Sequence, residues 1–146
     1  MKRYKIQKSP FIVPTTDGKH IAEHFGLATD GNKDISIAHM IAPAGWSEPF
    51  QTPEFDEYTF VIKGKKQFII ENETVVLEAG QSINIVKNTR VQYSNPFIEA
   101  CEYISICKPA FSMDLVLFRS RVVGQPERSF SQQGLNSSQA PGYHRA

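Results

Sequence analysis

Short stretches of alternating apolar and polar residues follow one another along the middle of the chain, separated by turn-forming residues. The alternation has the period of two that half-buried β-strands show. Clusters such as Pro-Ala-Gly and Lys-Gly-Lys stop each stretch before it reaches helical length. The pattern predicts strands over residues 35–42, 58–62, 67–70, 74–77, 82–86, 91–94 and 102–107.

Strands that recur this often, with tight polar turns, are typical of an all-β sandwich or barrel. Residues 11–13 predict an additional edge strand beside two prolines. Ser112 and Asp114 suit the start of a short helix over 112–119. We therefore expect an N-terminal segment at 1–34 that packs on a barrel at 35–111, followed at 112–146 by a short helix and a flexible tail rich in Ser, Gln and Gly.

Composition narrows the classes of protein to consider. The chain has 146 residues, with 16 Lys and Arg against 15 Asp and Glu. This balance gives no electrostatic reason to expect nucleic acid or an anionic membrane as a partner. No apolar run approaches the roughly 20 residues that cross a bilayer, and the basic N-terminus leads into residues too polar for a signal peptide. We expect a cytoplasmic protein.

The two cysteines, Cys101 and Cys107, fall in one predicted strand. Extended backbone separates them by roughly 20 Å, whereas a disulfide requires Cα atoms within about 7 Å. We therefore expect no intrachain disulfide and no zinc site from this pair.

Two sets of residues keep fixed spacings: Gly45, Gln51, Pro53, Glu57 and Gly64 form one set, and Gly80, Val86, Asn88, Val91 and Asn95 form the other. These sets resemble the two motifs of the cupin superfamily, G-x5-H-x-H-x3-E-x6-G and G-x5-P-x-G-x2-H-x3-N. The glycines that begin each motif and close the first, the acid and the final Asn match. The three metal-binding histidines do not, because Gln51, Pro53 and Val91 stand in their places.

The resemblance covers roughly residues 35–110 and extends to a branch of small single-domain Cupin_2-type proteins, through residues 46–58, 90–94 and 108–112. It implies a jelly-roll β-barrel with a pocket inside, and it supplies no reaction. The branch of the family that this sequence resembles lacks the usual metal-binding histidines.

In a small barrel the residues that face the interior alternate along each strand. If Glu57 points inward, Thr59 does too, and an inward Val91 implies an inward Tyr93. The resemblance places Gln51 at the wall or mouth of the same space. The predicted ligand-binding residues are Gln51, Glu57, Tyr93, Trp46, Glu48, Thr59 and His39.

Glu57 is the candidate catalytic residue, because burial in an apolar barrel raises the pKa of a carboxylate and suits it to acid–base work. The alternative is a wall carboxylate satisfied by neighbouring donors. Tyr93 has the parallel alternative of a buried, satisfied hydroxyl, and Trp46 that of core packing. For Glu48 the alternative is a side chain on a solvated loop, beside Glu54 and Asp56.

No cofactor is predicted, because the histidine positions hold residues that ligate weakly or not at all. If a divalent metal binds, Gln51, Glu57 and His39 would be its ligands, with Glu48 or His24 as further donors. Residues 20–24 also fit the H-x-x-E-H pattern of some zinc proteases. That chemistry needs a helix, whereas glycines bracket this stretch within a β-rich chain.

Three functions remain open from the sequence. The first is a binding cupin, metal-free or weakly metal-binding, that holds a sugar or an organic acid. The second is an isomerase, epimerase or lyase that uses Glu57 as general acid or base. The third is an interaction module, a homodimer formed through an outward apolar strand face for which the sequence suggests Phe60, Ile62, Phe68 and Ile70.

Overall fold

The structure is a computed structural model that describes residues 2–117. The tail predicted at 118–146, with the end of the helix predicted at 112–119, lies outside the described residues. The strands are β1 (Phe11–Ile12), β2 (His20–Phe25), β3 (Ser36–Ala42), β4 (Trp46–Ser47), β5 (Thr52–Pro53), β6 (Asp56–Lys63), β7 (Lys65–Ile70), β8 (Glu73–Glu78), β9 (Ser82–Ile85), β10 (Val91–Asn95), β11 (Cys101–Lys108) and β12 (Val116–Leu117). The helices are α1 (Leu27–Asp30) and the 3₁₀ turn η1 (Met113–Leu115).

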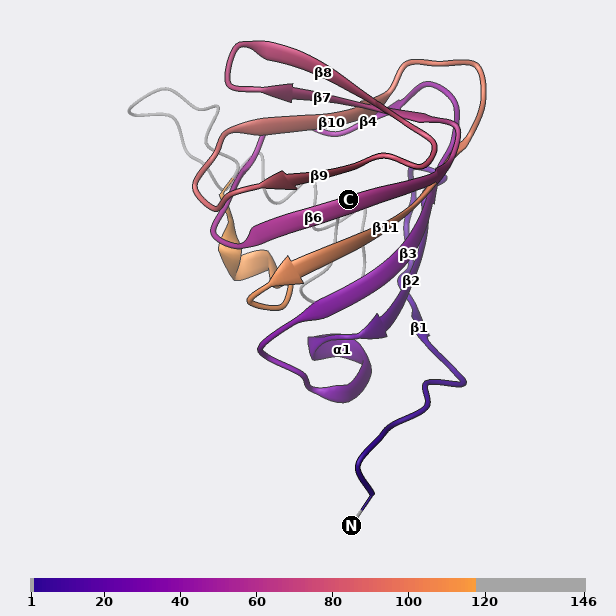
Figure 1. Cartoon of the computed structure of the whole chain (residues 1–146), viewed down its shortest axis with the longest axis vertical. Coiled ribbons are helices and arrows are strands. Elements are labelled where there is room, and N and C mark those ends of the chain that lie inside the picture. The colour runs from indigo at the N-terminus through magenta and orange to yellow at the C-terminus, as the bar shows by residue number, and fades with distance from the viewer. Residues whose placement is uncertain (1, 118–146) are drawn as a thin grey trace.

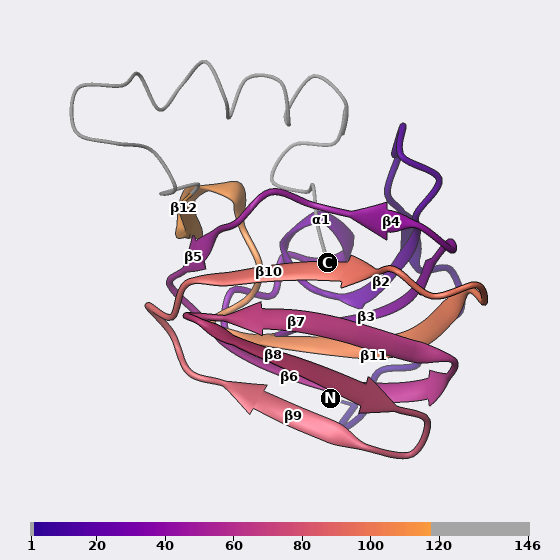
Figure 2. The ribbon, with the colours of Figure 1, turned by 90° about the horizontal axis from the view of Figure 1, so that it is seen from above.

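Two antiparallel sheets enclose the core. One has six strands in the order β1-β2-β3-β11-β6-β9, and the other has four in the order β4-β10-β7-β8. Figure 1 shows the smaller sheet at the top and the larger one curving below it, and Figure 2 shows β5 and β12 paired at one edge. The predicted all-β barrel is confirmed.

Alternation along β6 separates the interior from the outer surface. Glu57, Thr59 and Val61 are 2%, 1% and 0% exposed. Tyr58 and Phe60, in the opposite phase, are 43% and 45% exposed. The expected inward direction of Glu57 and Thr59 is therefore confirmed.

The outward direction expected for Phe68 and Ile70 on β7 is wrong. Phe68 is fully buried, and Ile70 packs against the core. The cause is the register of β7 with β10, which pairs Phe68 with Tyr93 and Ile70 with Val91 on the inner face. Lys66 has the same phase as Phe68 and is therefore also carried into the interior, where it is 0% exposed.

Gly64 lets the chain cross from the larger sheet to the smaller one between β6 and β7. Its φ of +81° lies in the left-handed region, and a Cβ added there would lie 2.4 Å from the carbonyl oxygen of Ala100. Glycine is required at this position for both reasons. The crossing sets Glu57 and Lys66 on opposite walls of one interior.

The ends of the described chain bear on three expectations. β1 is the predicted edge strand, since it pairs with β2 alone. Residues 20–24 are extended in β2, so the helix that H-x-x-E-H chemistry needs is not formed. Ser112 caps η1 as predicted, by accepting a hydrogen bond of 3.2 Å from the backbone N–H of Asp114. Within residues 2–117, no helix is long and apolar enough to cross a membrane.

Candidate functional site

Glu57 connects the two sheets inside the barrel. Its Oε1 accepts a hydrogen bond from the Tyr93 hydroxyl on β10, and its Oε2 accepts one of 2.7 Å from the Ser105 hydroxyl on β11. All three side chains are buried, at 2% exposure or less. Both carboxylate oxygens of Glu57 therefore have a hydroxyl donor inside the barrel.

The two motif sets meet at Gln51 and Val91, as the resemblance implied. These residues form an antiparallel bridge, with backbone N···O distances of 2.9 and 2.8 Å, and both are fully buried. The Gln51 amide nitrogen donates to Glu48 Oε1 over 2.7 Å. Glu48 is only 4% exposed, so the alternative of a solvated loop residue is wrong for it.

Lys19 is an interior residue that the sequence did not reveal. It is 3% exposed, and its Nζ lies 3.7 Å from Glu48 Oε2. The same ammonium group lies 4.2 Å from the centroid of the Trp46 ring, within the range of a cation–π contact. Trp46 is 5% exposed, and its indole N–H donates to Asp17 over 2.8 Å.

Lys66 lies opposite, against a group of aromatic rings. Its Nζ is 3.6 Å from the Tyr103 ring centroid, 4.9 Å from that of Tyr93 and 5.2 Å from that of Phe68. Tyr103 also faces Lys19, whose Nζ is 5.7 Å from the ring centroid. The Tyr103 ring therefore has two positively charged ammonium groups near it.

Cys101 on β11 lies close enough to both lysines to be affected by their charges. It is fully buried, and burial raises the pKa of its thiol to about 11. The charges of Lys66 and Lys19 both oppose this rise. Both cysteines are free thiols, which confirms that no disulfide joins them.

Two buried polar atoms of uncharged side chains have no hydrogen-bond partner within residues 2–117. They are Gln51 Oε1 and Thr59 Oγ1, on side chains that are 0% and 1% exposed. Buried polar atoms are nearly always hydrogen-bonded in folded proteins, by the protein or by another molecule. These atoms therefore mark where donors and acceptors from outside the chain would be placed.

His39 does not lie with this group. It occupies the outer phase of β3, its side chain is 30% exposed, and its Nε2 is 2.6 Å from Glu102 Oε2. The structure thus separates His39 from Gln51 and Glu57, because adjacent phases of a strand face opposite sides of the sheet.

The interior donors do not fit a divalent transition metal. Gln51, Pro53 and Val91 hold the positions of the family histidines, and both oxygens of Glu57 already accept hydrogen bonds from hydroxyl groups. Nowhere in the described part of the chain do three or more His, Cys, Asp or Glu side chains gather closely enough to hold a metal ion. We therefore derive no metal-dependent step.

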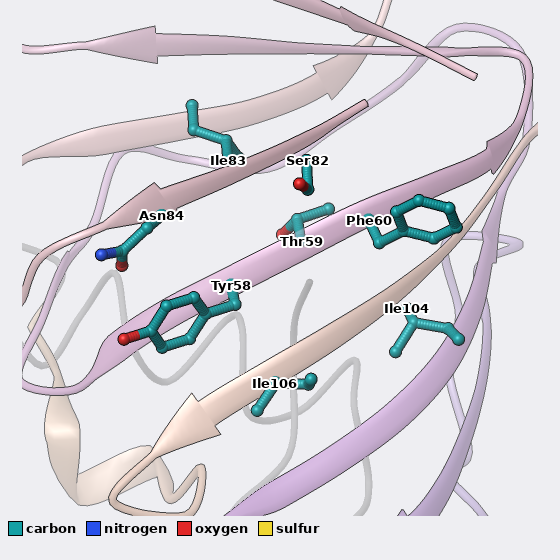
Figure 3. A pocket seen from close by; sticks show the side chains of 8 residues that line it. All are labelled: Tyr58, Thr59, Phe60, Ser82, Ile83, Asn84, Ile104 and Ile106. Carbon is teal, nitrogen blue, oxygen red and sulfur yellow. The ribbon is translucent and has the colours of Figure 1, made fainter. Parts of the chain in front are cut away.

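A separate pocket lies on the outside of the larger sheet, over β6, β9 and β11 (Figure 3). Its volume is about 240 Å³. The lining is mostly apolar and consists of Tyr58, Thr59, Phe60, Ser82, Ile83, Asn84, Ile104 and Ile106.

Comparison with known proteins agrees with this fold. The family model described as the Cupin domain, Cupin_2, matches residues 38–107. Among curated proteins, endoribonuclease YbeY of Myxococcus xanthus (strain DK1622) is 41% identical over 104 residues, which cover 71% of this chain. They cover 35% of that protein, so the chain spans about a third of it.

Two solved structures illustrate the likeness. The nucleoside dehydratase Pac13 superposes with a TM-score of 0.62 at 16% identity, covering 80% of this chain and 89% of that one. An RmlC-like cupin from Shewanella frigidimarina NCIMB 400 gives 0.61 at 14% identity, covering 75% and 93%. At these identities the likeness concerns the fold alone. The family match, together with the motif spacings, identifies the chain as a member of the cupin superfamily, of the Cupin_2 type.

Proposed function

We propose that the interior of this cupin binds a small polar metabolite, a sugar or an organic acid, through Glu57, Gln51 and Tyr93. The supporting observation is the convergence of these buried polar groups beside Gln51 Oε1 and Thr59 Oγ1, which have no partner within residues 2–117. Apolar walls with a few fixed polar groups are typical of small-molecule sites.

Access to such a site requires a covering segment to open, since its residues are almost fully shielded from solvent. The pair β5–β12 suits this role, because each strand has two residues and β5 follows Gln51 directly. One further backbone hydrogen bond of 2.7 Å, from Glu54 N to Leu115 O, joins the two segments. Pairings this short open at low free-energy cost.

The competing proposal is an enzyme in which Glu57 is the general acid or base. The observation that favours it is the direct hydrogen bond from Tyr93 to Glu57, which offers a route for a proton between them. An isomerase, epimerase or lyase would use such a pair.

The single tryptophan provides the test of binding, since Trp46 lies within the site. We would titrate the protein with panels of sugars and organic acids and follow Trp46 fluorescence and thermal stability. We expect saturable binding by the wild type and weakened binding by Glu57→Gln, with Glu73→Gln as the exposed control. If no compound binds saturably, or if Glu57→Gln binds as the wild type does, the proposed function is wrong.

The same variant separates a binder from an enzyme. Once a ligand is known, conversion by the wild type is measured beside its affinity. An enzyme loses about 10²–10⁴-fold in turnover in Glu57→Gln, because positioned acid–base groups contribute that much. A binding protein converts nothing, and only its affinity changes.

A further inference from the structure

We propose that the ligand of this interior site is a neutral, hydroxyl-rich compound of the sugar or polyol class, and not an organic acid. This inference rests on the proposed function and narrows it, since a sugar and an acid were both open. It follows from the hydrogen bonds that the interior leaves unmade and from the charges that it already holds.

The first observation concerns the side-chain oxygen of Gln51. The amide nitrogen of Gln51 donates to a carboxylate oxygen of Glu48 over 2.7 Å, which fixes the orientation of the amide because that oxygen accepts. Gln51 Oε1 has no hydrogen-bond partner within residues 2–117, and the side chain is fully buried. An amide oxygen only accepts, so a ligand group that completes it has to be a donor.

The second observation is that Thr59 Oγ1 faces the same interior and has no partner in the described chain either. Gln51 forms its backbone bridge with Val91, and Tyr93 is the next residue of β10 on the inner face. The Tyr93 hydroxyl donates to Glu57, and Thr59 is the next inward residue after Glu57 on β6. The Gln51 and Thr59 oxygens therefore belong to one interior that both motifs line.

A further acceptor without a partner lies along the same inner face. Four neighbouring strands of the larger sheet carry a row of register partners, each 2% exposed or less: Glu23, Ala38, Ser105 and Thr59. The Thr29 hydroxyl donates to Glu23 Oε2 over 2.5 Å, whereas Glu23 Oε1 has no hydrogen-bond partner among residues 2–117. The inner face of this sheet thus offers acceptors that call for donors from a ligand.

The third observation is the balance of buried charge. The buried charged residues of the described chain are three glutamates and two lysines, namely Glu23, Glu48, Glu57, Lys19 and Lys66. The lysines do not outnumber the carboxylates, so the interior holds no surplus of positive charge for an anion to neutralise. A ligand carboxylate would add a further negative charge in surroundings of low dielectric constant, which is unfavourable.

A hydroxyl-rich ligand meets these requirements better than an acid of the same size. Each hydroxyl both donates and accepts, so it can donate to Gln51 Oε1 and exchange hydrogen bonds with Thr59 Oγ1. A carboxylate only accepts, so an acid has one donor fewer and one charge more. The C–H groups of a sugar or polyol also suit the apolar and aromatic walls of the barrel.

The test compares probes in which one CH2OH group is replaced by a carboxylate. We would measure the binding of D-glucose against D-glucuronate, D-galactose against D-galacturonate, and D-sorbitol against D-gluconate, by calorimetry and Trp46 fluorescence. We expect at least one neutral compound to bind saturably and about tenfold or more tightly than its acid, because an added like charge in a buried site costs more than 1.4 kcal/mol.

Thr59→Val separates a role in binding from a role in folding. Valine keeps the shape of threonine and removes the hydroxyl whose oxygen has no partner. We expect affinity for the neutral compound to fall by about 3–10-fold, as when one hydrogen bond is lost, whereas the melting temperature of the free protein should not fall. Thr59→Ser keeps the hydroxyl and should keep the affinity. Thr74→Val, at an exposed position of β8, is the matched control and should bind as the wild type does.

Three results would overturn the inference while leaving the proposed function intact. They are acids that bind as tightly as their neutral counterparts or more tightly, a folded Thr59→Val protein that binds the neutral compound as the wild type does, and equal losses of affinity in Thr59→Val and Thr59→Ser. Absence of binding by every sugar, polyol and acid would instead overturn the proposed function together with the inference.

Discussion

At the scale of single residues, the interior of this barrel is polar where a typical core is apolar. The buried side chains include two lysines, two glutamates of the site and a glutamine, yet each lies beside a hydroxyl, an amide, an ion or an aromatic ring. Such a network is stable only when its members are satisfied, and removing one partner costs more than the bond itself contributed. Single substitutions inside the network should therefore have clear effects.

Tyr93→Phe tests the network directly. The substitution keeps the ring but removes the hydroxyl that donates to Glu57 Oε1, so a carboxylate oxygen is left buried with one donor fewer. We expect the free energy of unfolding to fall by about 1–3 kcal/mol, measured by urea denaturation. Tyr58→Phe, whose side chain lies in the exposed phase of β6, should change it by less than about 0.5 kcal/mol. Equal stability of the two variants would show that the hydroxyl contributes nothing.

Cys101 should make stability depend on pH in the alkaline range. Burial raises the pKa of its thiol from 9.0 to about 11, although Lys66 and Lys19 oppose the rise. Below pH 9 the thiol keeps its proton in both states. Between pH 9 and 11 the unfolded chain loses the proton and the folded chain keeps it, so the free energy of unfolding should fall as pH rises. Denaturation curves of wild type and Cys101→Ala should converge over this range, whereas parallel curves would contradict the assignment.

At the scale of elements, the positions of the central strands could be predicted from the sequence. Which side of each strand faces the interior could be predicted only for some of them. Alternation in β6 is clear, since Glu57 and Thr59 alternate with Tyr58 and Phe60. In β7 each phase holds one lysine and one isoleucine, so the alternation of polar and apolar residues leaves the facing of the strand ambiguous. The register with β10 decides which residues of β7 face the interior. Register depends on the tertiary structure, so a single sequence does not reveal it.

A site residue could be predicted from the sequence only where the cupin motifs or the alternation along a strand include it. The motif spacings led to Gln51, Glu57 and, through the period of two, to Tyr93. Lys19 and Lys66 lie outside the motifs, and lysines are almost never fully buried, so nothing in composition marks them. His39 was included on residue type alone, and the phase of β3 turns it outward.

The requirement for glycine in the turn at Gly64 can be tested by comparing two glycine-to-alanine variants. Gly64→Ala combines a left-handed φ with a Cβ 2.4 Å from a backbone oxygen, whereas Gly31→Ala has a similar φ of +75° and no atom within 4 Å. We expect Gly31→Ala to cost about 1 kcal/mol of stability from conformation alone. Gly64→Ala should cost at least about 2 kcal/mol more, since backbone at the contact cannot yield cheaply. Similar losses in the two variants would mean that the β6–β7 crossing adapts.

Opening of the short β5–β12 pair is measurable by hydrogen exchange. Because each strand has two residues, we expect amides of residues 51–54 and 113–117 to exchange well before those of the β7–β8 hairpin. A bound ligand should slow exchange at the first two segments and leave the hairpin unchanged. Protection equal to the hairpin in the free protein would require another route into the barrel.

At the scale of the whole molecule, apolar side chains gather on the outer face of the larger sheet. β3 and β11 carry isoleucines in their outer phase, at positions 37, 41, 104 and 106, and β6 adds Tyr58, Phe60 and Ile62 at 40–45% exposure. Large exposed apolar patches normally mark sites of interaction. A second copy of the chain is the occupant we expect, because one self-complementary patch then covers two faces at once.

Sedimentation velocity at micromolar concentration should therefore give the wild type twice the mass of one chain. Phe60→Lys places a charge on this face, in the lining of the pocket of Figure 3, and should yield monomers with an unchanged circular dichroism spectrum. Ile98→Lys is the matched control, because Ile98 is 95% exposed and lies in the loop between β10 and β11 rather than on the sheet. Binding energy concentrates in well-packed, desolvated residues of an interface, so a charge within the buried face should weaken pairing more than a charge on an exposed loop. A monomeric wild type, or a Phe60→Lys protein that still forms dimers, would contradict the prediction that two copies of the chain pair through this face.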